Sequence, residues 1–348
     1  FRALNDVDLP EACYLPDEPN PPANLLTWVY GYDQADRMTD VDFERRGTST
    51  ALSNRSETHR LDGVHNRVFM NYGGSNVSYE MSDAAGVKDR QVNQYTRTPT
   101  ESFLYDANGN MTRAVQNCGA DLNGDLVVTT PDMTILLASM SNQPADMRGD
   151  INLDGVVNSA DLTALLGQFG KQCEYTQYKY DYRNQLVSAA RYGVYDLDDD
   201  GEIDDYGPMT HEYGYDALGR RLSKKLAGSA TDHTRFIYGG VAAWQLLEMM
   251  EANAATTTSI AAFVYGDRGI DDPVSMRRST GQEYFYLLDD QNSVIGLWEP
   301  DGDVAERYDY TEYGSPRFLD ACLSDLMQTG TSAVATASNV GNPLLFQG

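Results

Sequence analysis

The feature that most constrains this 348-residue chain is a short pattern that recurs along it and is clearest in residues 213–225. Tyr213 and Tyr215 lie two positions apart, so both project from one face of an extended strand. Asp216 and Gly219 follow, and both are turn residues, glycine because it adopts a positive φ without steric cost. An alternating pattern resumes at Arg220. The pattern therefore predicts a β-hairpin.

The same unit returns along most of the chain. Further copies occupy residues 30–39, 105–112 and 178–187, and a degenerate set follows at 236–239, 263–266, 284–286 and 307–314. Hairpins that each leave an apolar face uncovered must stack on their neighbours to bury it. The repeats favour a stacked array of hairpins over the alternative of a generic all-β domain with tyrosine-rich strands.

Composition narrows the functions that are open to the chain. The 23 tyrosines against 10 phenylalanines suit half-exposed strands, because tyrosine joins an apolar ring to a hydroxyl that water can reach. The net charge of −26 argues against nucleic acid as a partner, since phosphates would be repelled. There is no apolar run of about 18 residues, so no membrane span is predicted. No catalytic motif can be recognised, and we predict that the chain is not an enzyme.

Residues 118–173 have a different character, with two acidic loops that each precede an apolar helical run. Carboxylates and amides at positions 1, 3, 5, 9 and 12 of such a loop converge on one Ca²⁺, together with a main-chain carbonyl from position 7. The first loop, residues 121–132, supplies Asp121, Asn123, Asp125, Thr129 and Asp132. The second loop, residues 150–161, supplies Asp150, Asn152, Asp154, Asn158 and Asp161. We predict two calcium sites, against the alternative of two solvated acidic turns.

The two loops are not equivalent in sequence. Position 6 of the second loop is Gly155, whereas the first loop has Leu126 there, although glycine eases the sharp turn. Position 9 of the first loop is Thr129, which would act through a water molecule. We therefore expect the first calcium ion to bind more weakly. A third acidic loop has Gly207 at its twelfth position, so a calcium site and a solvated turn are equally favoured there; its ligands would be Asp196, Asp198, Asp200 and Asp204.

The four cysteines allow three pairings. Cys118 and Cys173 bracket the acidic segment and are the best candidates for a disulfide, which leaves Cys13 and Cys322 near opposite ends of the chain. Two disulfides would indicate an oxidising compartment. Free buried thiols are the alternative.

Two stretches resemble the YD-repeat or Rhs-type proteins, which are relatives of the teneurin shell. They are residues 284–316, which contain Tyr-Phe-Tyr-Leu-Leu-Asp-Asp and later Glu-Arg-Tyr and Tyr-Gly-Ser-Pro, and residues 342–348, which are Asn-Pro-Leu-Leu-Phe-Gln-Gly. The resemblance covers most of the chain outside residues 118–173. It implies hairpins that wind into a β-spiral and close as a hollow shell.

The paired loops of residues 118–173 resemble a type I dockerin inserted between the repeats. In dockerins, loop positions 10 and 11 often contact a cohesin partner, and here these are Thr130 with Pro131 and Ser159 with Ala160. The unlike pairs put the usual two-way symmetric docking in doubt. The alternative is a module that calcium makes rigid and that packs on its neighbours.

Together these observations predict a mainly β fold, a YD-repeat β-hairpin spiral or shell with a small α-helical dockerin-like insertion. The expected regions are an acidic, proline-rich lead-in at 1–24, a YD-repeat region at 25–117, the calcium module at 118–173, a YD-repeat core at 174–318 and a C-terminal segment at 319–348. Within them, residues 319–327 could form one short helix, and residues 241–262 a strand followed by a loop.

The predicted function is that of a secreted or cell-surface structural protein, stabilised by Ca²⁺, which self-assembles into a filament or shell through exposed strand edges. One alternative is a fragment of an Rhs-type toxin-delivery cocoon. The other is a surface attachment protein that binds a cohesin-like partner.

Overall fold

A computed structural model gives the fold of the chain. It describes residues 2–3, 26–35, 37–45, 56–63, 65–72, 75–79, 94–98, 100–116, 118–142, 146, 148–193, 208–229, 231–240, 243–252, 256–267, 269, 271–289, 292–310, 314–322, 324–329 and 333–345. The chain divides into two units: the first is Phe1–Asp6 with Ala23–His211, and the second is Val7–Pro22 with Glu212–Gly348. In the described residues, the helices are too short to cross a membrane.

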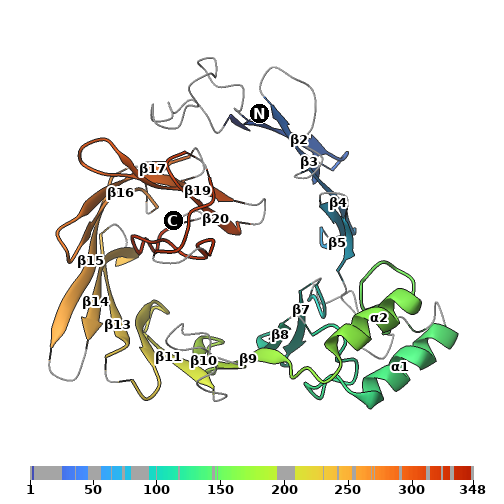
Figure 1. Cartoon of the computed structure of the whole chain (residues 1–348). Coiled ribbons are helices and arrows are strands. Elements are labelled where there is room, and N and C mark those ends of the chain that lie inside the picture. The colour runs from blue at the N-terminus through green and yellow to red at the C-terminus, as the bar shows by residue number, and fades with distance from the viewer. Residues whose placement is uncertain are drawn as a thin grey trace. The chain divides into compact units, whose positions relative to one another are not determined.

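The first unit contains two antiparallel groups of strands and both helices (Figure 1). One group pairs in chain order: β1 (Arg2–Ala3), β2 (Leu26–Tyr32), β3 (Met38–Arg45), β4 (Glu57–Leu61), β5 (Arg67–Tyr72) and β6 (Ser75–Ser78). The other is β7 (Glu101–Tyr105), β8 (Met111–Gln116), β9 (Glu174–Tyr180) and β10 (Leu186–Tyr192). The helices α1 (Thr130–Ser141) and α2 (Ser159–Gln168) lie between β8 and β9 in the sequence, so the helical segment interrupts two strands that pair directly.

The boundary between the units falls within β11 (Met209–Tyr215). In the second unit each strand again pairs with its neighbours in sequence. These strands are β12 (Arg221–Leu226), β13 (His233–Gly239), β14 (Gln245–Ala252), β15 (Thr257–Tyr265), β16 (Pro273–Arg278), β17 (Glu283–Leu288), β18 (Val294–Trp298), β19 (Val304–Tyr310) and β20 (Pro316–Leu319). The prediction of a mainly β fold is confirmed.

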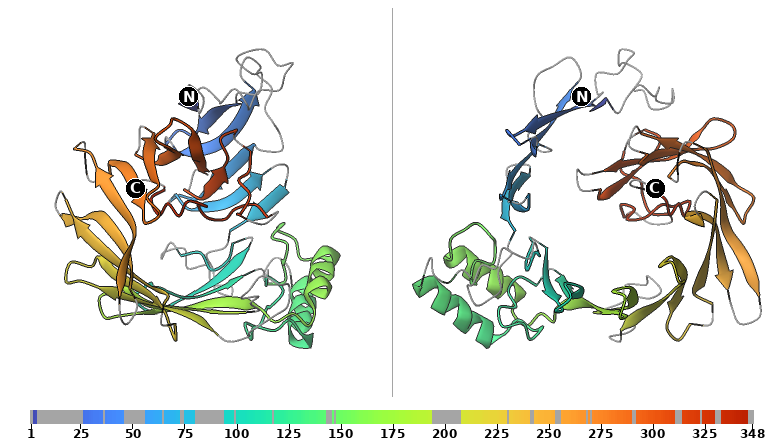
Figure 2. Two further views of the ribbon diagram at one scale, coloured as in Figure 1. Left: turned by 60° about the vertical axis from the view of Figure 1, so that its left-hand side comes forward. Right: turned by 180° about the vertical axis from the view of Figure 1, so that it is seen from behind.

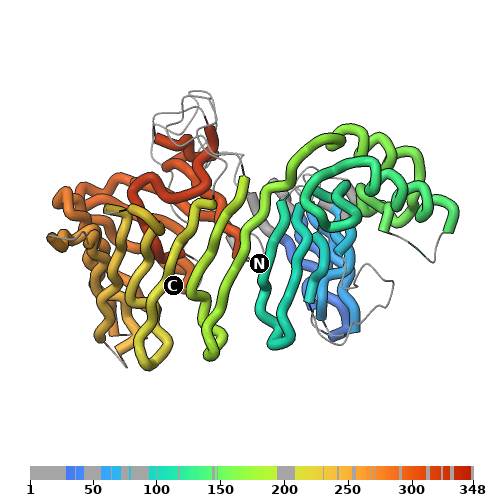
Figure 3. Tube along the Cα trace, turned by 90° about the horizontal axis from the view of Figure 1, so that it is seen from below, coloured from blue at the N-terminus to red at the C-terminus, as the bar shows by residue number. Residues whose placement is uncertain are grey.

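The aspartate of each repeat explains why the turns recur. Asp216 Oδ1 accepts hydrogen bonds from the main-chain N–H groups of Leu218 at 2.9 Å and Arg220 at 3.0 Å, while Gly219 has a φ of 89°. Asp106 and Asp181 accept from the same two turn positions at 2.8 to 2.9 Å. A carboxylate that satisfies two turn N–H groups fixes a tight hairpin at each of these three positions. Figure 3 shows two of these hairpins, β7 with β8 and β9 with β10, side by side.

The same turn corrects one prediction. Residues 319–327 do not form a helix, because Asp320 Oδ1 accepts from the N–H groups of Cys322 at 2.8 Å and Ser324 at 2.9 Å. The Asp320 N–H then donates to the Ser324 carbonyl at 2.9 Å, which closes a hairpin. A second correction concerns residues 241–262: the alanine- and threonine-rich part is not a loop throughout, because β15 begins at Thr257 and pairs with β14.

The core of the second unit is filled by its own C-terminal segment. Ala335 and Leu344 belong to the same buried cluster as the strand residues Met276, Leu297 and Tyr308. Figures 1 and 2 show the segment inside the curve of the strands β15 to β19. The cluster therefore joins residues from the six strands β15 to β20 to a segment without regular structure.

Polar contacts hold that segment in place. Glu306, which is 1% exposed, accepts hydrogen bonds from the Ser338 hydroxyl at 2.7 Å and the Val340 N–H at 3.1 Å. Asn342 accepts from the Tyr286 hydroxyl at 2.9 Å. Buried polar groups are tolerated where their hydrogen bonds are satisfied, so these contacts fix one arrangement of the segment.

Candidate metal-binding site

Two aspartates start the two helices of the first unit in the same way. The Asp132 carboxylate accepts the Thr129 N–H at 2.7 Å, and the Asp161 carboxylate accepts the Asn158 N–H at 2.8 Å. Each is the twelfth residue of its loop and lies in the first turn of its helix. Acidic side chains are favoured there, because they satisfy N–H groups that have no partner within the helix.

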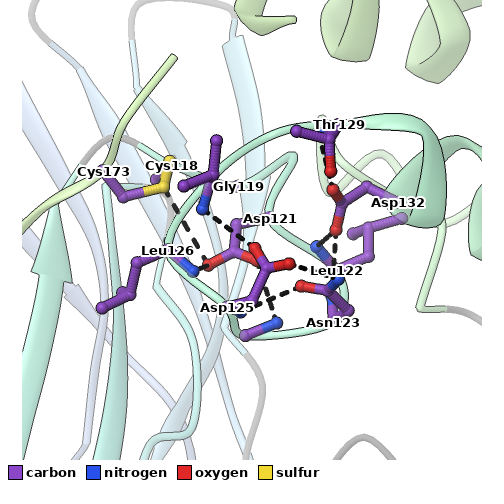
Figure 4. The surroundings of a disulfide bond; sticks show 12 residues. Cys118, Gly119, Asp121, Leu122, Asn123, Asp125, Leu126, Thr129, Asp132 and Cys173 are labelled. Atoms are coloured by element: carbon purple, nitrogen blue, oxygen red, sulfur yellow. Dashed lines mark hydrogen bonds between the residues drawn. A yellow bond between two sulfur atoms is a disulfide. The ribbon is translucent and has the colours of Figure 1, made fainter. Parts of the chain in front are cut away.

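The first loop is folded around its own carboxylates (Figure 4). The Asp121 carboxylate accepts the N–H groups of Gly124 at 2.9 Å and Leu126 at 3.0 Å. The other oxygen of Asp132 accepts the N–H groups of Leu122 and Asn123 at 2.8 and 3.1 Å. The side chain of Asn123 also donates to Asp125 at 2.9 Å. Hydrogen bonds thus link four of the predicted ligands of the first loop, whereas Asp121 binds other main-chain groups of the same loop; the four are Asn123, Asp125, Thr129 and Asp132.

The second loop repeats this network closely. The Asp150 carboxylate accepts the N–H groups of Asp154 at 3.1 Å and Gly155 at 2.9 Å. The Asp161 carboxylate accepts the N–H groups of Ile151 and Asn152 at 2.8 and 3.2 Å. In addition, Asn158 accepts the Ala160 N–H at 2.7 Å through its side chain. The structure therefore brings together the predicted ligands of the second loop as well.

Each loop contains two residues in the left-handed region, one glycine and one leucine, in opposite order. In the first loop Gly124 at position 4 has a φ of 77° and Leu126 at position 6 has a φ of 72°. In the second loop Leu153 at position 4 has a φ of 59° and Gly155 at position 6 has a φ of 91°. A positive φ is costly for a residue with a side chain, so each loop contains one strained leucine.

Burial shapes the electrostatics of the loops. Asp132 and Asp161 are fully buried and Asp150 is 4% exposed. Burial raises the pKa of Asp121 and of Asp150 above the ordinary value, and at Asp150 the charges of Asp161 and Asp154 raise it further. Carboxyl groups that lie close together and resist ionisation are stabilised in their charged form by a bound divalent cation.

The oxygens present fit calcium better than a transition metal. Carboxylate, amide and main-chain carbonyl oxygens are the ligands that Ca²⁺ prefers, in sets of six to eight. In the described part of the chain, no three carboxylate, imidazole or thiol side chains gather closely enough to hold a metal ion by themselves. A calcium site here would therefore depend on Asn123 or Asn152 and on a main-chain carbonyl in addition to the aspartates.

The Cys118–Cys173 disulfide is present, with a Cα–Cα distance of 5.6 Å and a sequence separation of 55. Both cysteines belong to the buried core of the helical segment. Cys322 is also disulfide-bonded, whereas Cys13 lies outside the described residues.

Sequence reasoning missed Arg97, which joins the helical segment to the strand region before it. Its guanidinium donates to the main-chain carbonyls of Asp150 at 3.0 Å, Ile151 at 2.9 Å and Gly119 at 3.4 Å. Asp150 and Ile151 open the second loop. No local sequence signal could have found this contact, because Arg97 is more than fifty residues away from the second loop in sequence.

The remaining predicted residues have varied placements. The four candidates for partner contact, at loop positions 10 and 11, are all exposed: Thr130, Pro131, Ser159 and Ala160. Thr130 and Ser159 are the first residues of α1 and α2. The ligands proposed for the third loop lie outside the described residues; they are Asp196, Asp198, Asp200 and Asp204.

Comparison with known proteins places the repeats in a family. The model of the teneurin YD-shell family matches residues 68–316. Teneurin-1 of Homo sapiens is 25% identical over 165 residues, which is 42% of this chain and 6% of Teneurin-1. The tRNA3(Ser)-specific nuclease WapA of Bacillus spizizenii is 28% identical over 109 residues, which is 31% of this chain and 4% of WapA. The chain thus spans only a small part of the length of these relatives.

One solved structure is similar over most of the chain but only loosely superposable. The crystal structure of TcdB2-TccC3 without the hypervariable C-terminal region has 14% sequence identity and a TM-score of 0.34, and covers 94% of this chain and 17% of that one.

The recurring aspartate turns and the stacked hairpins define a YD-repeat shell protein. Because the family model covers well over half of the sequence, this chain belongs to the teneurin YD-shell family. The predicted YD or Rhs-type fold is therefore confirmed, whereas the relation of residues 118–173 to dockerins stays a prediction.

Proposed function

We propose that the chain is a structural segment of a secreted YD-repeat shell, stiffened by calcium in a dockerin-like module at residues 118–173. The observation that carries the proposal is the matched pair of loops, in which equivalent aspartates accept equivalent N–H groups. Two copies of one loop design, each with five oxygen-bearing side chains at the calcium spacing, are more than a solvated acidic turn needs.

Calcium would be held by the side chains of each loop and would stabilise the module. The first loop would use Asp121, Asn123, Asp125, Thr129 and Asp132, and the second Asp150, Asn152, Asp154, Asn158 and Asp161. Bound Ca²⁺ supplies the positive charge that these converging carboxylates lack. The chain's own residues do the remaining work: the main-chain N–H groups orient each carboxylate, and the disulfide and the core fix the loop ends.

The test is calcium titration of the full chain by isothermal titration calorimetry after treatment with a chelator. The expected result is two bound ions, reduced to one by Asp161→Ala or by Asp132→Ala. A matched control is Asp146→Ala, which removes a carboxylate of the same segment that pairs with Arg148 instead of facing a loop. A wild-type protein that binds no calcium would refute the proposal, and so would one whose binding survives both loop changes.

The proposal further holds that the shell segment assembles into a filament or larger shell. Hairpins stacked in chain order leave a strand edge at each end of a sheet, and such an edge pairs readily with another copy. Electron microscopy of the native protein with millimolar calcium tests this step. Ordered filaments would support it, and dispersed single molecules at high protein concentration would count against it.

Two specific observations favour second candidates. The likeness to WapA, which its name describes as a nuclease, supports the alternative of a toxin-delivery cocoon. Extension of the gene beyond Gly348 into an unrelated domain would support this reading.

The exposed side chains at loop positions 10 and 11 support the alternative of a cohesin-binding attachment protein. Calcium-dependent capture by a purified cohesin, lost with Ser159→Asp but not with Thr163→Asp on the next turn of α2, would favour it.

A further inference from the structure

The first loop is held at both ends by the residues around the disulfide. The Asp121 N–H donates to the Cys118 carbonyl at 3.1 Å, and the Cys173 N–H donates to the Leu126 carbonyl at 2.9 Å (Figure 4). The Cys173 sulfur also lies 3.9 Å from the Asp121 carboxylate. Positions 1 and 6 of the first loop therefore both contact the disulfide-bonded residues.

The main chain that follows continues this contact as a short antiparallel pairing. The Val128 N–H donates to the Lys171 carbonyl at 3.0 Å, the Gly170 N–H donates to the Val128 carbonyl at 2.8 Å, and Val127 forms a bridge with Gln172. Leu126, the strained residue of the loop, lies at the end of this pairing. A left-handed leucine persists only where its surroundings fix it, and here the fixing partner is Cys173.

The second loop has a different anchor. Its first two carbonyls, those of Asp150 and Ile151, accept the Arg97 guanidinium, and its carboxylates bind N–H groups of the same loop. Its described hydrogen bonds involve neither disulfide-bonded cysteine. The two loops, alike inside, are thus attached to the rest of the unit by unlike means.

A cavity lies beside Cys118, one end of the disulfide. It has a volume of about 320 Å³ and lies where the helical segment meets the strand region, with Arg97, Glu101, Cys118 and Ile151 among its lining residues. Cys118 and Cys173 are themselves only 5% and 3% exposed. A space of this size beside Cys118 admits a small thiol, which a packed core would exclude.

We propose that the Cys118–Cys173 disulfide is a redox-sensitive latch for the first loop alone. Two molecules of a low-molecular-weight thiol attack in succession: the first breaks the S–S bond and forms a mixed disulfide, and the second releases it. The products are two protein thiols and one small-molecule disulfide, so the thiol is oxidised as the protein is reduced. Opening the latch releases Asp121 and positions 6 to 8 of the first loop. The Asp132 carboxylate still holds Leu122 and Asn123, and Arg97 keeps the second loop in place.

Hydrogen exchange of the full chain tests the latch without requiring calcium. The variant is Cys118→Ser with Cys173→Ser, and its matched control is Cys13→Ser with Cys322→Ser, which removes the same number of cysteines outside the segment. We expect the protection of the Leu126, Val128 and Gly170 amides to fall at least about tenfold in the variant, and that of Ile151, Asn152 and Gly155 to change less than about threefold. The control should leave both sets unchanged.

Two further arms separate the switch from a purely structural disulfide. A low-molecular-weight thiol should give the folded wild-type protein the exchange pattern of the variant, and Arg97→Gln should give the reverse pattern, with the second loop released first. The latch is overturned if both loops lose protection equally, if the first loop loses none, or if the thiol acts only after the protein is unfolded.

A consequence for calcium rests on the proposed function. In the variant the first site should lose about tenfold or more in affinity while the second stays within about threefold. Because the exchange experiment is made without metal, a wild-type protein that binds no calcium refutes the proposed function and leaves the latch to be decided by exchange alone.

Discussion

The two loops of the helical segment share one hydrogen-bonding plan but differ in where they place their strain. Asp121 and Asp150 both accept the N–H group of position 6, and Asp132 and Asp161 both accept the N–H groups of positions 2 and 3. The left-handed leucine, however, stands at position 6 in the first loop and at position 4 in the second. The hydrogen-bonding pattern of the loops therefore depends on the carboxylates, whereas the order of glycine and leucine at positions 4 and 6 can change.

Burial adds a second difference between the two leucines. Leu153 is 3% exposed, whereas Leu126 is half-buried and packs against the core of the helical segment. The strained conformation of Leu153 is therefore offset by burial of its side chain. The strained conformation of Leu126 depends on the main-chain contacts between residues 126–128 and residues 170–173.

The largest effect should come from removing the buried carboxylate that each loop has at position 12. We expect Asp161→Ala to lower the free energy of unfolding of the segment by about 4 kcal/mol, since three N–H groups, of Ile151, Asn152 and Asn158, lose their acceptor. Asp132→Ala should cost about the same. Hydrogen exchange of the metal-free protein measures both.

An exposed carboxylate of the second loop provides the control. Asp154→Ala removes, at the surface, the acceptor of the Val156 N–H and of the Asn152 side-chain amide, and should cost less than about 1 kcal/mol. If Asp132→Ala lowered the free energy of unfolding by less than half as much as Asp161→Ala, the hydrogen bonds of the position-12 carboxylate would not stabilise both loops in the same way.

The next effect separates the two leucines. Leu153→Gly should lower the free energy of unfolding by about 3 kcal/mol, because the loss of a buried side chain exceeds the relief of strain. Leu126→Gly should stay within about 1 kcal/mol of the wild type, since relief of strain offsets the smaller loss of packing. Chemical denaturation followed by exchange at α1 and α2 measures the difference.

The glycines of the two loops are the matched control for strain. Gly124 and Gly155 both have a positive φ and open space where a Cβ would stand. Alanine at either position should therefore lower the free energy of unfolding by about 1 kcal/mol, with equal effects at the two positions. Unequal costs would mean that the two left-handed positions are not equivalent, and the comparison of the leucines would lose its basis.

A smaller effect concerns calcium. Each loop contains one strained leucine, so strain no longer distinguishes them, and position 9 becomes the main difference, with Thr129 in one and Asn158 in the other. We expect Thr129→Asn to tighten the first site about fivefold, near 1 kcal/mol, because an amide oxygen reaches a calcium ion that threonine contacts through water. Two-site calorimetric titration measures this, and Asn158→Thr should weaken the second site by a similar factor.

The sequence predicted much of this architecture because its signals are local. The Tyr-Asp turn is decided within five residues, as the bonds of Asp216 to Leu218 and Arg220 show, so the hairpins could be placed from the pattern alone. The calcium ligands proposed for the two loops also come from spacing within twelve residues, and calcium binding stays a prediction. Residues 319–327 were wrongly expected to form a helix because Asp320 was not recognised as a turn residue of the same kind.

What the sequence did not show depends on distant contacts. The left-handed conformation of Leu153 follows from the fold of the whole loop, and no propensity predicts it. The bonds of Arg97 to the second loop join segments that only the folded chain brings together. The C-terminal segment packs on Glu306 and Tyr286 through contacts that no periodic pattern marks.

The smallest effect is a dependence on pH that opposes the usual behaviour of surface aspartates. Burial raises the pKa of Asp121 and Asp150 in the metal-free protein. The folded state therefore keeps their protons at a pH where the same aspartates in the unfolded chain, with an ordinary pKa of about 3.9, have released them. The stability that these groups contribute is therefore lost as pH rises from the ordinary value through the raised one. Under the proposed function, calcium bound to the ionised carboxylates should reverse that slope.

Carbon-13 shifts of the side-chain carboxyl groups measure these pKa values directly, and Asp146 in the same segment is the internal control. Its hydrogen bonds with Arg148 lower its pKa, so it should titrate below the ordinary value while Asp121 and Asp150 titrate above it. Arg97→Gln should move Asp150 further up and leave Asp121 unchanged, because the Arg97 charge favours the ionised form of Asp150. If Asp121 shifted equally, Arg97 would serve both loops and the difference in their anchors would disappear.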